Sequence, residues 1–331
     1  MSSDLIEAKS RVQTSVAEAP AVRPSAQDSG RRWAVLLAGG DGTRLQSLTL
    51  KIAGDSRPKQ FCPIIGGESL FAQTRARIKP LFHTDQELFV VTRAHESYYR
   101  EELRDVDESR IISQPLNRGT GIAVAIALLH ILERDADAVV IFLPCDHYYS
   151  DSEACGQAIR TAISGAERYP DSIVLVGAKA HYPEVEYGWI ELGSAISHVP
   201  IPLQQVDRFW EKPSLPQAQA LLQRGCIWNT FVTVGHARAF LNLVCSQVPD
   251  VVPSLSKALA ENELEAAYRV VPTVDFSRQV LVPQPHRLLA VTDTTSGWAD
   301  LGSPTRVMDI LARNKIQPTW LRDGYGLSMA K

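Results

Sequence analysis

Apolar residues occur along this chain in short unbroken runs, separated by longer segments of helical periodicity. Four runs have the length of a strand, namely residues 33–38, 88–92, 138–143 and 172–177. Continuous rather than alternating apolarity is typical of strands that are covered on both faces, as in a parallel sheet. We therefore expect these four segments to be central strands.

Segments with helical periodicity lie between and after these runs. We expect helices over residues 69–78, 95–106, 120–133 and 151–168, of which 120–133 is the most strongly apolar. Alternation of strands and helices predicts an α/β fold with an open, mostly parallel, doubly wound (Rossmann-like) sheet and helices on both faces. Ligands of such folds bind at the carboxyl ends of the strands. The residues directly after each apolar run are therefore candidates for a site.

The pattern changes after about residue 180. Shorter strands are expected at residues 188–192, 204–210, 230–234 and 288–291, with helices at 216–224 and 236–248 and a closing helix at 303–314. This pattern predicts an α+β second half that completes the sheet. Because no internal repeat or linker is evident, we expect a single domain over residues 32–331, with one half at about 32–180 and the other at about 181–310.

The first residues of the chain have a different composition. Residues 1–31 are rich in Ser, Ala, Glu and Pro and have no sustained apolar face, which predicts a disordered leader. A short helix over residues 5–16 is the alternative for part of it.

Composition and charge exclude several classes of protein. The chain has 331 residues, 45% hydrophobic and 21% charged, and its net charge of -3 gives no electrostatic footprint for nucleic acid or an anionic membrane. Its five cysteines are scattered and form no C-x-x-C pair, which favours free thiols in a reducing compartment. No stretch has the length of a membrane span and no signal peptide is evident. We expect a cytoplasmic protein.

A glycine-rich loop follows the first strand. Residues 38–44 read Ala-Gly-Gly-Asp-Gly-Thr-Arg, in which Gly39, Gly40 and Gly42 let the backbone turn sharply and approach a ligand. Exposed amides in such a loop can bind an anion. The loop matches neither the Walker A motif nor G-x-G-x-x-G, so by itself a plain structural turn is an equal alternative. Arg44 and Lys59 add two cations that suit phosphate.

The combination of these two segments resembles a known family. Gly-Gly-x-Gly-Thr-Arg-Leu at residues 39–45 and Pro-Lys-Gln-Phe at 58–61 resemble the signature of sugar-1-phosphate nucleotidyltransferases, closest to the mannose-1-phosphate guanylyltransferase branch. The resemblance covers residues 33 to about 310 and makes 32–180 the nucleotide half and 181–310 the sugar-phosphate half. The spacer at 45–58 is longer than the family usually has. The roles that the resemblance implies are nucleotide binding by Gly39, Gly40, Gly42 and Thr43, and catalysis by Arg44 and Lys59 through contacts to the triphosphate.

A second family-like stretch, residues 114–121, precedes the most apolar helix. The resemblance implies that Gln114 and Thr120 contact the nucleotide, and the Gln114 amide could read a base edge with one donor and one acceptor group. Gly119 stands where the family has asparagine, so the identity of the nucleotide base is left open. The structural alternative is a helix entry that uses Thr120 as its N-cap.

Two aspartates that lie far apart in the chain are candidate metal ligands. Asp146 follows the third long strand, and Asp300 belongs to Gly-Trp-Ala-Asp-Leu-Gly at residues 297–302. Both match family motifs, and the resemblance implies that the pair binds the catalytic Mg²⁺. This ion prefers one or two carboxylates together with substrate phosphate oxygens and water. His147 is interpreted as structural rather than as a ligand, because imidazole suits softer metals.

Three further segments match the sugar-phosphate side of the family. The resemblance implies that Gly188, Glu211 and Asn229 contact the sugar and that Lys212 contacts its phosphate. By themselves Glu211 and Lys212 would be interpreted as a solvated charge pair. Phe231 stands where the family has glycine, and we expect a different pocket wall there.

The resemblance implies a reaction between a nucleoside triphosphate and a sugar 1-phosphate. GTP and mannose 1-phosphate are the first candidates, in a Mg²⁺-assisted in-line attack that gives the nucleotide sugar and pyrophosphate. A nucleotidyltransferase for another sugar or base is one alternative, and a non-catalytic sugar-nucleotide sensor is another. The glycine spacing disfavours a dinucleotide-dependent oxidoreductase. No nucleic acid or membrane partner is expected, and a homo-oligomer is left open.

Overall fold

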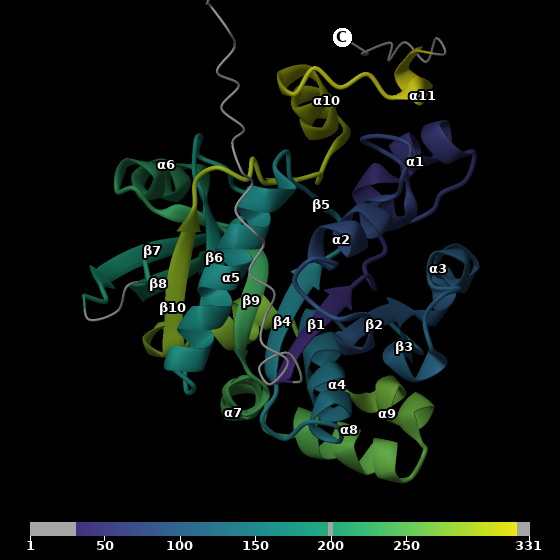
Figure 1. Ribbon diagram of the computed structural model, residues 1–331, viewed down its shortest axis with the longest axis vertical. Helices are drawn as coiled ribbons and strands as arrows, with labels where there is room; N and C mark the ends of the chain where they lie inside the picture. Colours follow the sequence, from purple (N-terminus) through teal and green to yellow (C-terminus); the bar gives the residue numbers. More distant parts are fainter. Residues whose placement is uncertain (1–30, 198–200, 323–331) are drawn as a thin grey trace, which may run out of the picture.

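The computed structural model describes residues 31–197 and 201–322. The predicted leader, apart from Arg31, and the alternative helix over residues 5–16 lie outside this part of the chain. A single nine-stranded sheet runs through the molecule in the order β3-β2-β1-β4-β9-β6-β10-β8-β7 (Figure 1). Its strands are β1 (Arg32–Leu37), β2 (Glu87–Thr92), β3 (Ile111–Gln114), β4 (Val139–Pro144), β6 (Ile173–Lys179), β7 (Gly188–Ala195), β8 (Gln204–Glu211), β9 (Ile227–His236) and β10 (Leu288–Asp293).

The sheet is mixed but mostly parallel. Strands β3, β2, β1 and β4 pair in parallel, and so do β6 and β10. Strand β9 is antiparallel to β4, β6 and β7, and β8 is antiparallel to β10 and β7. All strands except β8 and β9 therefore run in one direction, which confirms the predicted α/β sheet.

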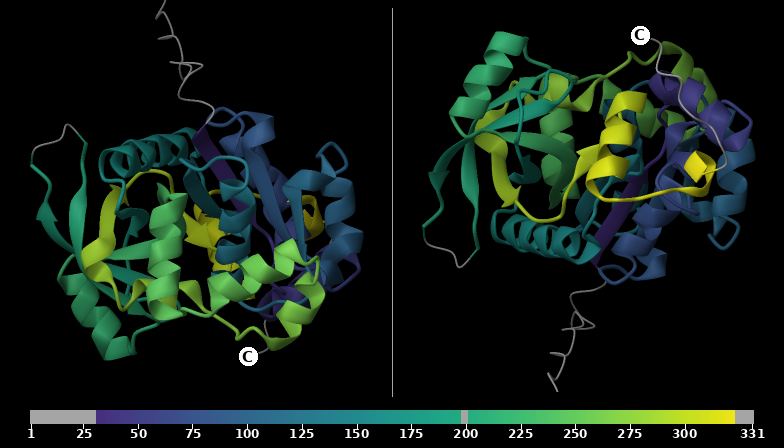
Figure 2. Two further views of the ribbon diagram at one scale, coloured as in Figure 1. Left: turned by 90° about the horizontal axis from the view of Figure 1, so that it is seen from below. Right: turned by 90° about the horizontal axis from the view of Figure 1, so that it is seen from above.

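Helices cover both faces of this sheet (Figure 2). The helices α4 (Thr120–Leu132), α7 (Ala237–Gln247) and α8 (Val251–Ala260) pack on one face. On the other face lie α2 (Leu70–Ile78), α3 (Glu96–Glu102) and α5 (Ser152–Arg168). The remaining helices are α1 (Gln46–Ala53), α6 (Leu215–Gln223), α9 (Leu264–Val270), α10 (Pro304–Arg313), α11 (Thr319–Arg322) and a π-helix at Phe276–Leu281.

Burial on both faces explains the unbroken apolar runs. In β1 the side chains of Trp33 and Val35 enter the core under α4, whereas Ala34 and Leu36 enter the core under α2 and α5. Neither face of such a strand contacts water, so no polar alternation is expected.

Besides the apolar cores on the two faces of the sheet, a third apolar cluster joins the spacer at residues 45–58 to the end of the described chain. The spacer between the glycine loop and Lys59 forms α1, which ends at Gly54 with φ of +80°. Leu48 of α1 packs in this cluster with Leu311 of α10 and Trp320 of α11. Figure 2 (right) shows these yellow helices beside the purple α1. The lengthened spacer thus contains helix α1, against which the closing helix α10 packs.

A small second sheet lies near the end of β4. It pairs β5 (His147–Tyr148) with β11 (Ala299–Asp300) in antiparallel fashion, with Asp300 opposite His147. Asp146 immediately precedes β5, so this pairing brings the two predicted metal ligands to the same place.

Candidate active site

One cavity of about 590 Å³ lies at the carboxyl ends of β1 and β4. Its wall includes every residue that the sequence singled out for the site: Gly39, Gly40, Gly42, Thr43, Arg44, Lys59, Gln114, Thr120, Asp146, Gly188, Glu211, Lys212, Asn229 and Asp300. These residues come from segments that lie far apart in the chain, and the fold brings all of them together. Their individual roles stay predictions.

The glycine loop is braced by the segment that carries Lys59. The Gln60 amide donates hydrogen bonds to the carbonyl oxygens of Ala38 (2.9 Å) and Gly40 (2.7 Å). Gly42 has φ of +61°, and a Cβ there would lie 2.9 Å from the backbone nitrogen of Lys59. A glycine is therefore required where the two segments touch. Gln60 was not singled out from the sequence, although it belongs to the same Pro-Lys-Gln-Phe stretch.

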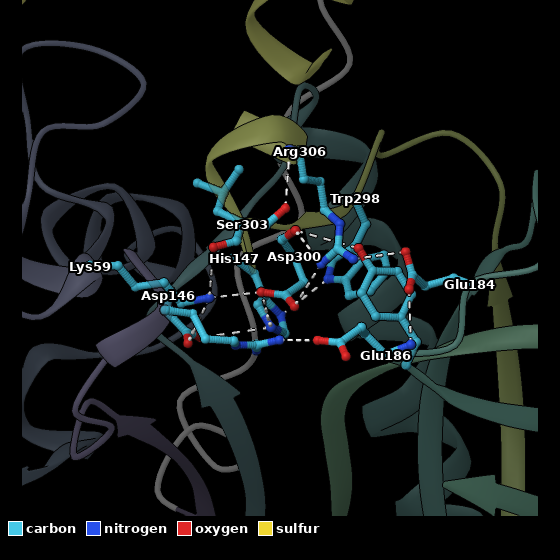
Figure 3. A network of polar contacts seen from close by, with 12 residues as sticks. Lys59, Asp146, His147, Glu184, Glu186, Trp298, Asp300, Ser303 and Arg306 are labelled. Atoms are coloured by element: carbon cyan, nitrogen blue, oxygen red, sulfur yellow. Dashed lines mark hydrogen bonds and ion pairs between the residues drawn. The ribbon is translucent and has the colours of Figure 1, made fainter. Parts of the chain in front are cut away.

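Lys59 belongs to the cavity wall and lies between the two aspartates (Figure 3). Its Nζ is 2.7 Å from Oδ1 of Asp300, 3.2 Å from Oδ2 of Asp146 and 3.2 Å from the carbonyl oxygen of Leu301. An ammonium group has three donors, and all three are engaged here. Lys59 begins a single 3-10 turn, Lys59–Phe61, and its side chain is only 8% exposed.

The opposite charges of Lys59 and Asp300 keep both of these largely buried groups ionised. Burial alone would raise the pKa of the Asp300 carboxyl, but Lys59, His147 and Arg306 outweigh it and hold the pKa at about 2. Burial likewise lowers the pKa of the Lys59 ammonium, but the charges of Asp146 and Asp300 outweigh it and raise that pKa above its ordinary value. Lys59 and Asp300 are therefore both charged at neutral pH.

Arg306 supports Asp300 from the closing helix, and the sequence analysis missed it. Its Nη1 is 3.4 Å from Oδ2 of Asp300, and its Nη2 is 2.8 Å from Oε2 of Glu184. Its guanidinium also lies 4.7 Å from the ring centre of Tyr187. A cation six residues after Asp300 is the only signal that could have indicated this contact.

His147 is oriented by a tryptophan. The Trp298 indole donates a hydrogen bond to Nδ1 of His147 at 3.1 Å, so the imidazole proton lies on Nε2. That nitrogen faces Asp146 at 3.7 Å and Asp300 at 4.0 Å. Burial lowers the pKa of His147 and favours the neutral ring. With its proton on Nε2, the ring offers no lone pair to a cation between the carboxylates, in line with a structural role.

The two carboxylates by themselves fit a magnesium ion. Within residues 31–197 and 201–322, no group of three or more His, Cys, Asp or Glu side chains is arranged to hold a metal. Asp146 and Asp300 nevertheless lie side by side, because both carboxylates contact the Lys59 ammonium. Mg²⁺ typically uses one or two carboxylates and completes its shell with substrate phosphates and water. The donor set suits such an ion better than a metal that needs a full protein cage.

The opposite end of the cavity is built from β7, β8 and β9. A Cβ on Gly188 would lie 2.9 Å from Oε2 of Glu211 and 3.2 Å from Cβ of Asn229. The glycine thus lets these two polar side chains come together. Lys212 Nζ lies 3.5 Å from Oε1 of Glu211. Burial raises the pKa of Glu211, and Lys212 opposes that rise.

The segment before α4 forms the remaining wall. The Tyr268 hydroxyl donates to Oε1 of Gln114 at 3.2 Å, which fixes the orientation of that buried amide. The alternative that Thr120 is the N-cap of α4 is wrong. Gly119, with φ of +81°, occupies the cap, and the Thr120 hydroxyl accepts a hydrogen bond from the backbone nitrogen of Phe276 at 3.0 Å.

Comparison with known proteins identifies the family of this chain. Residues 33–315 match the model of the family described as nucleotidyl transferase. The chain belongs to this family. Among the described residues, no helix combines the length and apolarity needed to cross a bilayer.

Several relatives carry more specific names. A mannose-1-phosphate guanylyltransferase of Sinorhizobium fredii is 29% identical over 279 residues, which are 81% of this chain and 52% of the relative. The alginate biosynthesis protein AlgA of Pseudomonas fluorescens is 30% identical over 280 residues, 81% of this chain and 56% of the relative. The chain thus spans little more than half the length of the curated relatives it matches.

A solved structure shares the fold over most of its length. The crystal structure of a mannose-1-phosphate geranyltransferase from Thermus thermophilus superposes with a TM-score of 0.75 at 28% identity. The match covers 87% of this chain and 80% of that one.

Other cavity residues were not predicted as site residues. An ion pair joins Arg44, next to the glycine loop, to Glu186, two residues before Gly188. The segment around the π-helix also contributes, and no motif marks it in the sequence. The polar and aromatic wall residues that were not predicted as site residues are Asn117, His147, Glu186, Tyr187, Thr273, Asp275, Ser277 and Trp298.

Proposed function

We propose that this protein transfers a nucleotidyl group from a nucleoside triphosphate to a sugar 1-phosphate and releases pyrophosphate. The observation that carries the proposal is the position of Lys59, Asp146 and Asp300 in one cavity with the glycine loop and with the Gly188–Glu211–Asn229 cluster. The names of the relatives make GTP and mannose 1-phosphate the first substrates to test. Gly119 stands where the guanylyltransferase branch is expected to have asparagine, so the base is part of the test.

The proposed reaction depends on the positioning of the two substrates more than on proton transfer. A phosphate oxygen of the sugar 1-phosphate is already an anionic nucleophile. It forms a bond to the α-phosphorus, while the bond from that phosphorus to the bridging oxygen breaks and pyrophosphate leaves with the electron pair. The chain has to hold the two reactants in line and neutralise the charge on the leaving group. Arg44 and Lys59 lie on the triphosphate side of this proposed arrangement, and Lys212 lies on the sugar-phosphate side.

We propose that Asp146 and Asp300 hold Mg²⁺ when the substrates bind. The ion would neutralise phosphate charge and orient phosphate oxygens. Arg306 contacts Asp300 at 3.4 Å, and Nε2 of His147 faces Asp146 at 3.7 Å and Asp300 at 4.0 Å.

A pyrophosphate-release screen tests the proposal. GTP, UTP, dTTP and ATP are each combined with mannose 1-phosphate and glucose 1-phosphate in the presence of Mg²⁺. Release with one pair and not with either substrate alone supports nucleotidyl transfer. Binding of a nucleotide sugar in calorimetry without any pyrophosphate release would instead indicate the non-catalytic sensor.

Lys212→Ala is expected mainly to weaken sugar-phosphate binding. The lysine is 57% exposed at the side chain and adjoins Glu211, so its loss should leave the triphosphate side intact. We expect KM for the sugar 1-phosphate to rise about tenfold, since a charge-assisted contact to phosphate contributes roughly 1.5–3 kcal/mol, with KM for GTP unchanged. Lys257→Ala, which removes an exposed lysine paired with Glu261, is the matched control. Equal changes in both KM values would contradict the assignment.

Gly42→Ala is expected to impair nucleotide binding. The new Cβ meets the Lys59 backbone nitrogen, and the residue must adopt a left-handed conformation that costs about 1–2 kcal/mol. Gly54→Ala is the matched control, because Gly54 has φ of +80° but open space around its Cα. Both variants carry the left-handed strain, but Gly42→Ala should lose more thermal stability because only its Cβ meets backbone atoms, and only Gly42→Ala should lose affinity for GTP in a calorimetric titration. Equal GTP affinities would show that the close approach at Gly42 has no part in binding.

A further inference from the structure

Phe231 adopts a backbone conformation that aromatic residues rarely take. Its φ is +64°, in the left-handed region that favours glycine. The described residues include only three other non-glycine positions with positive φ, namely Lys212, Asn262 and Lys315. Residues held in this region by their surroundings cluster at functional sites. Phe231 and Lys212 both line the cavity.

A bulge in β9 creates this conformation. In the antiparallel ladder of β6 and β9, Leu175 pairs with Thr233 and Gly177 pairs with Asn229. These two pairs are two residues apart in β6 but four residues apart in β9. The extra residues of β9 leave the ladder at Phe231. Bulges of this kind occur beside active sites, where they redirect a side chain.

Two polar side chains hold the bulge in place. Oδ1 of Asn229 accepts a hydrogen bond from the backbone nitrogen of Phe231 at 3.1 Å. The fully buried Thr230 hydroxyl donates to the carbonyl oxygen of Val176 at 2.6 Å and accepts from the backbone nitrogen of Val232 at 3.2 Å. The conformation of Phe231 is therefore built into the fold, and its backbone is tied directly to Asn229.

Only part of the Phe231 ring packs against the hydrophobic core. Phe231 is half-buried, and its ring centre lies 6.1 Å from that of Phe276. Its remaining surface lines the cavity beside Asn229. Glycine would satisfy this backbone without strain, so the fold does not need a phenylalanine here. A role of the ring in the cavity would account for the strain.

We propose that Phe231 is a specificity-determining residue that forms the apolar wall of the sugar subsite. Glu211 and Asn229 present polar groups to the hydroxyl edge of a hexose. The face of an aromatic ring carries negative potential and suits the C–H face of a pyranose. Because the ring occupies part of the subsite, it also excludes a hexose that carries a bulky substituent there. This inference rests on the proposed function and deepens it.

The test compares Phe231→Gly and Phe231→Leu with the wild-type protein. Pyrophosphate release is measured with mannose, glucose and N-acetylglucosamine 1-phosphates, and binding of each sugar 1-phosphate is measured by calorimetry, which needs no turnover. For Phe231→Gly we expect sugar affinity to fall about tenfold and preference for the N-acetylated sugar over mannose to rise about tenfold. KM for GTP should stay within about twofold. Phe231→Leu, which keeps apolar volume, should have an intermediate effect on sugar affinity.

Two controls separate this role from packing and from the proposed function. Phe240→Leu alters a fully buried ring that also packs against Phe276 but does not line the cavity, so it should lower Tm and leave sugar selectivity unchanged. If the wild type binds and converts a sugar 1-phosphate but Phe231→Gly keeps its affinity and selectivity, the specificity role is overturned and the proposed function stands. If the wild type neither binds nor converts any sugar 1-phosphate, both are overturned.

Discussion

Replacement of Lys59 by alanine is expected to lower turnover by on the order of a hundredfold to a thousandfold, the range found when one preorganised electrostatic group is removed from an active site. Lys59 is a cation of the cavity wall, within 3.2 Å of both predicted metal ligands. Its ammonium would stabilise charge that develops on the leaving pyrophosphate. KM for the sugar 1-phosphate should change little, since Glu211, Lys212 and Asn229 are untouched. Steady-state pyrophosphate release measures both quantities.

Stability must be separated from chemistry in this variant. Loss of Lys59 leaves two carboxylates facing each other, and removal of one partner from a buried ion pair costs about 3–5 kcal/mol. Lys59→Met keeps most of the side-chain volume, and both variants are assayed below their unfolding temperatures. Lys51→Ala, on an exposed position of α1, is the control and should match the wild type. An unchanged rate of pyrophosphate release in Lys59→Ala would exclude the proposed role.

The parts of the fold that could be predicted are those governed by local pattern. The central strands were found because burial on both faces produces unbroken apolar runs, as in β1 and β4. The glycine loop, Gln114 and Asp146 lie together because they stand at or directly after the carboxyl ends of β1, β3 and β4, and parallel strands end at one edge of the sheet. Asp300 does not follow one of these strands. Its position depends on the pairing of β11 with β5 and on the packing of α10 against α1.

The features that were missed depend on contacts between distant segments. Helix α1 has only eight residues, and its N-cap Leu45 makes no side-chain hydrogen bond. Such a short, uncapped helix is not stable by itself, so its sequence carries no helix signal. Its stability comes from packing against α10 and α11. The π-helix at Phe276–Leu281 has no sequence rule that would predict it. The left-handed backbone of Phe231 contradicts its residue type and follows from Asn229, Thr230 and the register of β6.

Asp300→Asn is expected to reduce turnover by about a thousandfold. The substitution keeps the shape of the side chain but removes the charge that faces Lys59 and Arg306. A catalytic metal contributes several kcal/mol to transition-state stabilisation, and about 4 kcal/mol corresponds to a thousandfold in rate. The measurement is pyrophosphate release as a function of Mg²⁺ concentration. The concentration for half-maximal rate should rise together with the fall in kcat.

This dependence on Mg²⁺ distinguishes a metal ligand from a structural carboxylate. Asp146→Asn should show the same shift if the two aspartates share one ion. Asp105→Asn breaks an ion pair with Arg75, in which Asp105 is 65% exposed, and should alter neither rate nor Mg²⁺ dependence. If Asp300→Asn loses thermal stability and rate but keeps the wild-type Mg²⁺ dependence, Asp300 acts only by holding Lys59 and Arg306, and the proposed metal site is excluded.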